Sequence, residues 1–161
     1  CKINLINTGL NTMTGGRLKK LQNYLDEGTF MLTYGDGLSD IDINKLINFH
    51  KEHGKMITIT AVRPPARFGE LSINSKNEVT SFDEKPQLKE GWINGGFFVI
   101  EPEFLNFIDG ETTLLEKEPL EKASAIGELM AYKHEGFWQC MDTKRDKDLL
   151  EKIYLDRNPW G

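Results

Sequence analysis

The strongest indication of the fold is a compact apolar run that ends at a glycine-flanked aspartate. Residues 29–34 are Thr-Phe-Met-Leu-Thr-Tyr, and Gly35-Asp36-Gly37 follows directly. A short apolar run that stops at turn residues is typical of a buried strand whose end opens into a loop. Asp36 is therefore predicted at the carboxyl end of a strand, which is the edge where open α/β sheets bind ligands. We expect an α/β fold.

The segments around this strand alternate between helical and strand patterns. Leu18, Leu21 and Leu25 recur at helical spacing within residues 17–25, and Asp42 suits the N-cap of a helix that ends at Gly54. The other predicted elements are strands at 2–7, 56–62, 93–100, 128–133 and 137–141, a hairpin of 68–73 and 78–82, helices at 102–108 and 118–126, and a last helix from Thr143 with Asp146 as capping-box partner. The hairpin interrupts the alternation, so we expect a mixed sheet.

Composition excludes several classes of function. The chain has 161 residues, 39% hydrophobic and 28% charged, which suits a single globular domain over residues 1–161. Its net charge is -5 and its Lys and Arg residues are not clustered, which argues against nucleic-acid binding. No apolar run could cross a bilayer and no signal peptide is visible, so we expect a cytoplasmic protein. The two cysteines, Cys1 and Cys140, have no metal-ligand spacing.

Two acidic residues lie in motifs that suit a metal ion. Asp36 is flanked by glycines, which let a phosphate and its metal approach the backbone, although this pattern is equally typical of an ordinary turn. Asp142 precedes Thr143 at the predicted helix start, where it could simply complement a helix N-terminus. Together, two carboxylates are what Mg²⁺ usually takes from a protein. We expect a Mg²⁺ site at Asp36 and Asp142.

Two further motifs suit a phosphorylated sugar. Lys85 follows a strand and precedes a proline, so its ammonium could be held for a sugar phosphate, and Glu84 could accept hydrogen bonds from sugar hydroxyls. Most surface Glu-Lys pairs, however, have no function. Asn94 precedes Gly95-Gly96 in an apolar strand, which two glycines should weaken unless something must come close. Its amide suits a polyhydroxylated ligand because it both donates and accepts.

The segment from Thr12 to Arg17, Thr-Met-Thr-Gly-Gly-Arg, is the candidate for holding a base or an anion. It combines exposed amide donors, hydroxyls and an Arg at a helix start, although a plain helix connection is the commoner role. Among the aromatic residues, Trp138 is predicted as a wall of the sugar pocket. The residues assigned to the core are Phe97, Phe98 and Phe137. The histidines lack ligand spacing and are expected on the solvated surface: His50, His53 and His134.

In their order, these motifs resemble the sugar-phosphate nucleotidyltransferase family and, within it, the glucose-1-phosphate cytidylyltransferases. The matching segments are Thr8-Gly9, Met13-Thr-Gly-Gly-Arg-Leu18, Tyr34-Gly-Asp-Gly37, Pro64-Pro-Ala-Arg-Phe-Gly69, Phe82-Asp-Glu-Lys-Pro86, Asn94-Gly-Gly-Phe-Phe98 and Gly136-Phe-Trp138 through Asp142-Thr143. They cover nearly the whole chain. The Met-Thr-Gly-Gly-Arg-Leu segment separates this branch from thymidylyl- and uridylyltransferases.

The resemblance implies a Rossmann-like mixed-sheet fold and the Mg²⁺-dependent reaction of CTP with glucose 1-phosphate to give CDP-glucose and pyrophosphate, for deoxysugar and O-antigen lipopolysaccharide precursors. By motif match, Asp36, Lys85 and Asp142 form the catalytic set. The residues implied to contact CTP are Thr12, Gly15, Gly16, Arg17 and Gly35. The residues implied to contact the sugar phosphate are Gly69, Glu84, Lys85, Asn94 and Trp138. A homo-oligomer is expected.

The sequence departs from the family in two places. The family's Gly-Gly-x-Gly-Thr-Arg-Leu loop and Pro-Lys-Pro lysine have no counterpart here, and Asn7 stands where the family commonly has Asp. We therefore expect an N-terminally truncated member, inactive alone, with an exposed strand edge beside residues 29–34. Three alternatives stay open: a uridylyl- or thymidylyltransferase, a sugar-nucleotide-binding module without chemistry, and a metal-dependent glycosyltransferase. The Glu-Lys-Pro and Asn-Gly-Gly motifs argue against the last.

Overall fold

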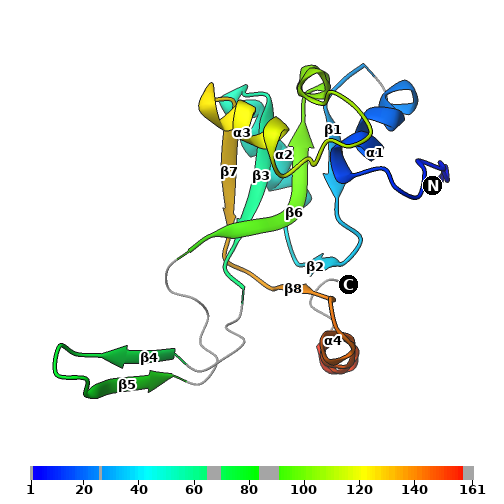
Figure 1. The fold of residues 1–161 in the computed structure, drawn as a ribbon. Helices are drawn as coiled ribbons and strands as arrows, with labels where there is room; N and C mark the ends of the chain where they lie inside the picture. The colour runs from blue at the N-terminus through cyan, green and yellow to red at the C-terminus, as the bar shows by residue number, and fades with distance from the viewer. Residues whose placement is uncertain (1, 26, 65–69, 84–90, 158–161) are drawn as a thin grey trace. The chain divides into compact units, whose positions relative to one another are not determined.

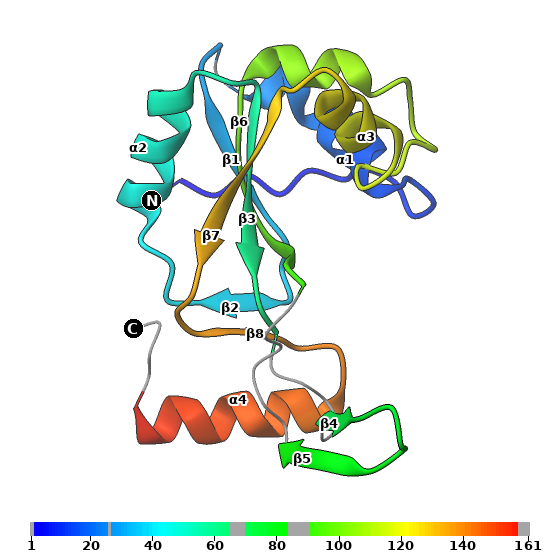
Figure 2. The same cartoon turned by 90° about the vertical axis from the view of Figure 1, so that its left-hand side faces the viewer.

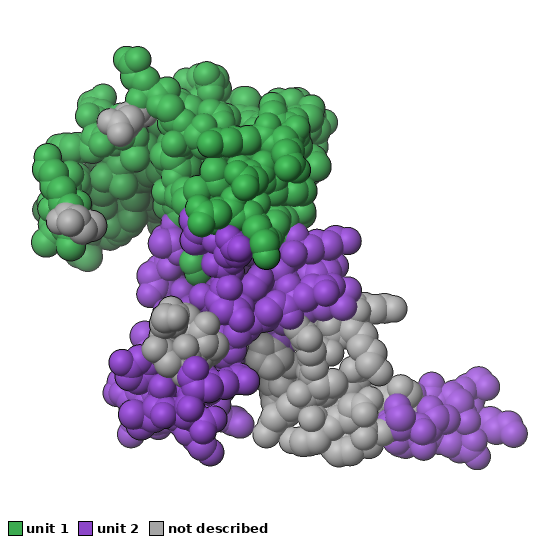
Figure 3. All heavy atoms as spheres, turned by 180° about the vertical axis from the view of Figure 1, so that it is seen from behind, with its two compact units in different colours: residues 1–32, 44–59, 97–132 green, residues 33–43, 60–96, 133–161 purple. Residues whose placement is uncertain are grey.

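The computed structural model of the protein describes residues 2–25, 27–64, 70–83 and 91–157. Their strands are β1 Phe30–Thr33, β2 Gly37–Ser39, β3 Ile57–Val62, β4 Glu70–Ile73, β5 Val79–Asp83, β6 Ile93–Ile100, β7 Leu129–His134 and β8 Trp138–Cys140. Their helices are α1 Thr14–Leu21, α2 Ile43–His53, α3 Glu118–Ala125 and α4 Lys144–Asp156, with 3₁₀ turns at Gln22–Tyr24 and Pro102–Phe107. The chain divides into two compact units (Figure 3), unit 1 (Cys1–Leu32, Asn44–Ile59, Phe97–Tyr132) and unit 2 (Thr33–Ile43, Thr60–Gly96, Lys133–Gly161).

The strands β1, β6, β3 and β7 form a four-stranded sheet in that order, and its residues 30–32, 57–59, 97–100 and 129–132 belong to unit 1. In this sheet β6 runs opposite to β1, β3 and β7 (Figure 1), so the expected mixed sheet is confirmed. Helix α2 lies on one face of the sheet, and α1 and α3 lie on the other (Figure 2).

The core of unit 1 is built from apolar residues of the sheet and of the helices that cover it. Phe98 and Ile100 of β6, Leu46 of α2 and Phe104 after β6 are fully buried. β6 is apolar along its second half because both of its faces are covered there. The last residue of β1, Thr33, and the last two of β7, Lys133 and His134, belong to unit 2.

Unit 2 contains the antiparallel pair β2–β8, the hairpin β4–β5 and helix α4. The hairpin predicted at 68–73 and 78–82 is confirmed for its described residues, as Glu70–Ile73 paired with Val79–Asp83, and positions 68 and 69 lie outside the described residues. Asn77 in its turn has a φ of 64°, a left-handed value that Asn tolerates better than most residues. Helix α4 begins as predicted, because Thr143 and Asp146 form a complete capping box. The predicted bounds of β6 are also those observed.

Three expectations about elements are wrong, and one strand was not foreseen. Residues 2–7 form no strand, because none of the described strands pairs with them, and Leu5 is 93% exposed. Helix α1 begins at Thr14 rather than at residue 17, so the glycine pair lies inside its first turn. β1 forms at the predicted place but is not buried, and Met31 is 40% exposed. The strand stands at one end of the described sheet, in agreement with the exposed strand edge expected beside residues 29–34. The three-residue strand β2 was not predicted.

Candidate active site

Two carboxylates of unit 2 flank the short antiparallel pair β2–β8. Asp36 directly precedes β2, and Asp142 lies two residues after the end of β8. Gly37 faces Cys140 in the register, and the next residue pair is joined by a hydrogen bond of 2.8 Å from Met141 N–H to the Asp36 carbonyl. Both carboxylates are exposed. The fold therefore brings Asp36 and Asp142, which are 106 positions apart in the numbering, to the same end of one strand pair.

The start of helix α4 does not depend on the Asp142 side chain for its cap. The Thr143 hydroxyl accepts the Asp146 N–H at 3.2 Å, and Asp146 Oδ2 accepts the Thr143 N–H at 2.9 Å. The hydrogen-bonded cap of α4 is therefore made by Thr143 and Asp146. The thiol of Cys140 lies 3.4 Å from Asp142 Oδ2.

The Asn94-Gly95-Gly96 segment of β6 is packed against other parts of unit 2. Gly96 has a φ of 80°, and a Cβ on it would lie 3.0 Å from the Tyr34 ring. A Cβ on Gly95 would lie 2.8 Å from Val62 Cγ1. The two glycines are thus explained by close approach of side chains of this chain, where the sequence had suggested close approach of a ligand.

The predicted site residues fall into three groups. Unit 2 contains five of them: Gly35, Asp36, Asn94, Trp138 and Asp142. Unit 1 contains the remaining described ones, namely Thr12, Gly15, Gly16 and Arg17. The other three lie outside the described residues: Gly69, Glu84 and Lys85.

The expectation of exposed amide donors in the segment 12–17 is wrong for its glycines. The N–H groups of Gly15 and Gly16 both donate to the Thr113 carbonyl, at 3.0 and 3.3 Å, and both glycines are buried. A Cβ on Gly16 would lie 2.6 Å from the Glu111 Cα, so this glycine lets the helix approach the 111–113 backbone. Thr12 is 5% exposed, and its hydroxyl donates to the Thr8 carbonyl at 2.6 Å.

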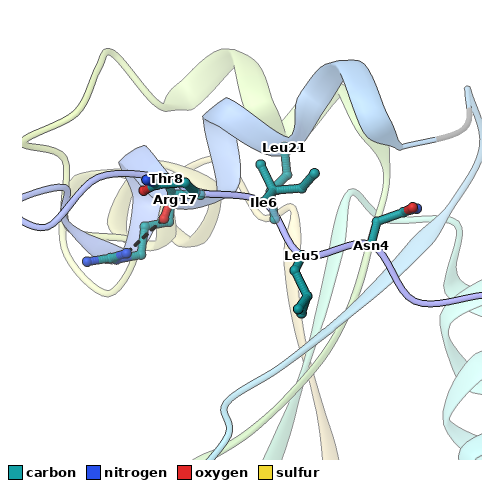
Figure 4. Close-up of a pocket in the computed structure, with 7 residues that line it drawn as sticks. Asn4, Leu5, Ile6, Thr8, Arg17 and Leu21 are labelled. Atoms are coloured by element: carbon teal, nitrogen blue, oxygen red, sulfur yellow. Dashed lines mark hydrogen bonds between the residues drawn. The ribbon is translucent and has the colours of Figure 1, made fainter.

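Arg17 is the exposed member of this segment's predicted set. Its guanidinium donates to the Thr8 hydroxyl at 2.7 Å and to the Leu10 carbonyl at 3.2 Å. It lines an open groove of unit 1 (Figure 4) with Asn4, Leu5, Ile6, Asn7, Thr8 and Leu21. The groove is formed by the extended N-terminal residues lying beside α1.

The expectation that the histidines lie on the solvated surface is wrong for His50 and His134, which have little exposure. His50 is 2% exposed and joins Thr58 of β3 to Glu101 at the end of β6. His134 in unit 2 lies 2.9 Å from Asp40 and 3.2 Å from the Phe137 carbonyl. No sequence spacing predicts these contacts. The fold, and not a motif, places Thr58 and Glu101 beside His50 and places Asp40 beside His134.

His50 and His53 share a hydrogen-bond network, in which the partners assign the proton positions when both rings are neutral. Lys55 N–H donates to His53 Nδ1 at 2.9 Å, so neutral His53 carries its proton on Nε2 and donates it to Thr58 Oγ1 at 2.7 Å. The Thr58 hydroxyl then donates to His50 Nδ1 at 2.8 Å, and His50 Nε2–H donates to Glu101 at 2.9 Å. Burial, followed by the neighbouring His50 and Lys55, lowers the pKa of His53. Burial alone would raise the pKa of Glu101, but hydrogen bonds from Thr29 and His50 outweigh it, so this pKa is lowered.

The described residues form an α/β fold with a mixed sheet. The family model described as nucleotidyl transferase matches residues 6–151. Glucose-1-phosphate cytidylyltransferase of Salmonella typhimurium is 49% identical over 160 residues, which are 98% of this chain and 62% of that protein. Mannose-1-phosphate guanylyltransferase 1 of Arabidopsis thaliana is 32% identical over 89% of this chain and 42% of its own length. The chain belongs to the nucleotidyl transferase family.

A solved structure agrees with this assignment of the fold. HddC from Yersinia pseudotuberculosis superposes with a TM-score of 0.66 at 22% identity, over 89% of this chain and 64% of that one. The expected mixed α/β nucleotidyltransferase fold is therefore confirmed. The chain spans 62% of the length of its Salmonella relative. None of the described helices has the length and apolar character that a membrane span requires.

Proposed function

We propose that this protein transfers a cytidylyl group from CTP to glucose 1-phosphate, with release of pyrophosphate and formation of CDP-glucose. The observation that carries the proposal is the pair Asp36 and Asp142 at one end of the β2–β8 pair, in a chain 49% identical to a glucose-1-phosphate cytidylyltransferase. The ordered motifs around both carboxylates support the same activity. Phosphorylated, charged substrates of this kind suit a cytoplasmic enzyme.

Asp36 and Asp142 fit a Mg²⁺ ion by chemistry and by number. Both offer exposed carboxylate oxygens from adjacent chain segments, and Mg²⁺ takes one or two carboxylates and fills its octahedron with waters and phosphate oxygens. Among the described residues, no group of three or more His, Cys, Asp or Glu side chains comes together, so a closed all-protein cage is not offered there. When bound, Mg²⁺ would neutralise charge on the nucleotide phosphates.

The reaction needs positioning and charge neutralisation more than covalent chemistry. An oxygen of the glucose 1-phosphate phosphate group attacks the α-phosphorus of CTP in line, a new P–O bond forms, and the bond to the β-phosphate breaks to release pyrophosphate. In this proposal Lys85 holds the sugar phosphate, Glu84 and Asn94 bind sugar hydroxyls, and the Gly69 backbone and the Trp138 ring complete that pocket.

The CTP side of the proposal is narrowed by the contacts within unit 1. Thr12, Gly15 and Gly16 are buried, and their hydroxyl or amide protons are already donated within the chain. Their contribution would be to shape the segment. In unit 1 the remaining candidate for contact with the nucleotide is therefore Arg17, which is exposed. The candidate of unit 2, Gly35, is exposed as well.

The test is pyrophosphate release by the full-length protein with glucose 1-phosphate, Mg²⁺ and each of CTP, UTP, dTTP and GTP in turn. Turnover with CTP is expected to exceed that with the others. Preference for UTP or dTTP would make the protein a different sugar-1-phosphate nucleotidyltransferase. Binding of CDP-glucose without turnover would make it a sugar-nucleotide-binding module.

The metal carboxylates are tested by Asp36→Asn and Asp142→Asn, with Asp148→Asn on α4 as the matched control. Each site variant should lower turnover about 100-fold or more, because a metal ion is worth several kcal/mol of transition-state stabilisation. The control should keep wild-type turnover, and all three variants should unfold at similar urea concentrations. A site variant with near-normal Mg²⁺-dependent activity would remove that carboxylate from the site.

A further inference from the structure

The glycine pair of β6 leaves two backbone groups to be satisfied by side chains. With a φ of 80°, Gly96 turns the chain away from regular strand geometry. The Gly96 N–H donates to the side-chain oxygen of Asn94 at 2.8 Å, and the Gly95 carbonyl accepts the indole N–H of Trp138 at 2.8 Å. Since Gly95 and Gly96 are buried, these bonds meet a need that water could not readily meet.

The same turn joins the segments that carry the two carboxylates. The Gly96 carbonyl accepts the Tyr34 N–H at 2.9 Å, and Tyr34 begins the short loop that leads to Asp36. Trp138 begins β8, which leads to Asp142 and pairs with β2 through Ser39. Gly37 lies close to Trp138, since a Cβ on Gly37 would be 3.6 Å from the Trp138 indole nitrogen. All of these residues belong to unit 2.

The bonds at this turn determine what Asn94 offers to a ligand. Its carboxamide oxygen already accepts the Gly96 N–H, and among the described residues its NH₂ group is given no acceptor, so this group is the one that Asn94 would offer to a ligand. Asn94 would therefore donate to a hydroxyl or phosphate oxygen. Trp138 likewise has its N–H engaged by the Gly95 carbonyl, so its indole nitrogen is not a donor to a ligand.

We propose that Trp138 is a positioning residue: its indole N–H, bound to the Gly95 carbonyl, holds the Asn94–Gly96 turn in register with the segments of Asp36 and Asp142. This role rests on the proposed function for its kinetic effect, but the contact itself does not. It differs from the predicted role of the Trp138 ring as a sugar-pocket wall. A wall needs the ring faces, whereas positioning needs the N–H.

The decisive variant keeps the ring and removes the N–H. Benzothienylalanine in place of Trp138 retains two fused rings of nearly the same shape but has sulfur where Trp has N–H. Trp138→Phe removes the N–H with a smaller ring, and Trp92→Phe is the matched control, since Trp92 stacks with Arg63 and Lys133 instead. The full-length protein is used throughout.

Two measurements are made on each variant. The first is nuclear magnetic resonance of the Asn94 side-chain NH₂ group, whose signals should move in both Trp138 variants and stay in place in the Trp92 control. The second is kcat/KM for glucose 1-phosphate, well below the unfolding temperature. The value of kcat/KM should fall about tenfold in both Trp138 variants. A tenfold change corresponds to about 1.4 kcal/mol, which is the size of one hydrogen bond lost to a buried carbonyl.

The outcomes separate the positioning role from the others. Normal kcat/KM and unmoved Asn94 signals in the benzothienylalanine protein overturn the proposal, even if Trp138→Phe is impaired or fails to fold, because ring shape would then be what matters. A lowered unfolding temperature with unchanged kinetics and unmoved signals overturns it in favour of a purely structural role. If wild-type protein does not turn over CTP, the proposed function fails, and the Asn94 signals alone decide the positioning role.

Discussion

Two threonines of β3 offer a sharp test of the buried histidine network, because they differ in hydrogen bonding and in little else. Thr58 and Thr60 are both 0% exposed and lie two positions apart on one strand. The Thr58 hydroxyl contacts His50 at 2.8 Å and His53 at 2.7 Å. The Thr60 hydroxyl has no hydrogen-bond partner among the described residues. Replacing each by Val makes the same chemical change in the two settings.

The expected effects have opposite signs. Thr58→Val leaves the buried Nδ1 of His50 without a partner, which costs about 1–3 kcal/mol, while the half-buried His53 can turn to water. Thr60→Val removes a hydroxyl whose burial is uncompensated, at a gain of about 1 kcal/mol or more on mutational scales. Strand propensity cancels in the comparison, because both changes are Thr to Val. The two variants should therefore differ by about 3 kcal/mol in the free energy of unfolding.

Urea unfolding followed by circular dichroism measures this difference, provided that the dependence on urea has the same slope in both variants. A changed slope would show that the unfolding transition itself differs. Equal midpoints for the two variants, or a lower midpoint for Thr60→Val than for Thr58→Val, would refute the assignment of the network. His50→Leu combined with Thr58→Val should then be less than additive, since both remove the same bond.

Three further predictions concern the site and the stability of the chain. Lys85→Ala in the full-length protein should raise KM for glucose 1-phosphate more than KM for CTP, because a lost charge-assisted hydrogen bond is worth about 1.5–3 kcal/mol; equal effects on both substrates would reject its assignment. Thr143→Ala should lower the free energy of unfolding by about 1 kcal/mol through loss of the α4 cap. Thr143→Ser keeps the hydroxyl and should unfold like the wild-type protein. Stability should fall with acid in two stages. Because the pKa of His53 is lowered in the folded chain, the unfolded chain binds a proton at this residue before the folded chain does as the pH falls below 6.5. The same holds for Glu101 and Glu128 as the pH falls below 4.5. Urea midpoints that stay constant down to pH 5 would contradict the first stage, and His53→Gln should abolish it.

The sequence predicted best the elements that local rules specify. β6 and the start of α4 were predicted at their observed residues, because a long apolar run and a capping box are each complete within a short segment. Residues 2–7 were predicted wrongly, because a strand also needs a partner edge, and none of the described strands supplies one. β2 was missed because its three residues are held in strand geometry by β8, far along the chain.

Histidine environments could not be predicted for the same reason. His50 lies on α2 in a charged stretch, which suggested a solvated side chain. Its burial depends on Thr58 and Glu101, which the sheet places beside that helix and which no spacing connects with it. A buried ionisable residue of this kind is thus found from the sheet order and not from its neighbours in the sequence.

The glycine pairs show what a motif can and cannot predict about a site. Gly15-Gly16 was interpreted as a source of amide donors and Gly95-Gly96 as room for a ligand, and in both pairs the absence of a Cβ is required. The group that comes close is nevertheless part of the chain, the Glu111 backbone in one case and Val62 in the other. A glycine signals only that something approaches, whereas an exposed carboxylate is a group that a metal ion can bind. Asp36 and Asp142 are therefore the better candidates for site residues than the two glycine pairs, and variants of these two carboxylates discriminate best between an enzyme and a binding module.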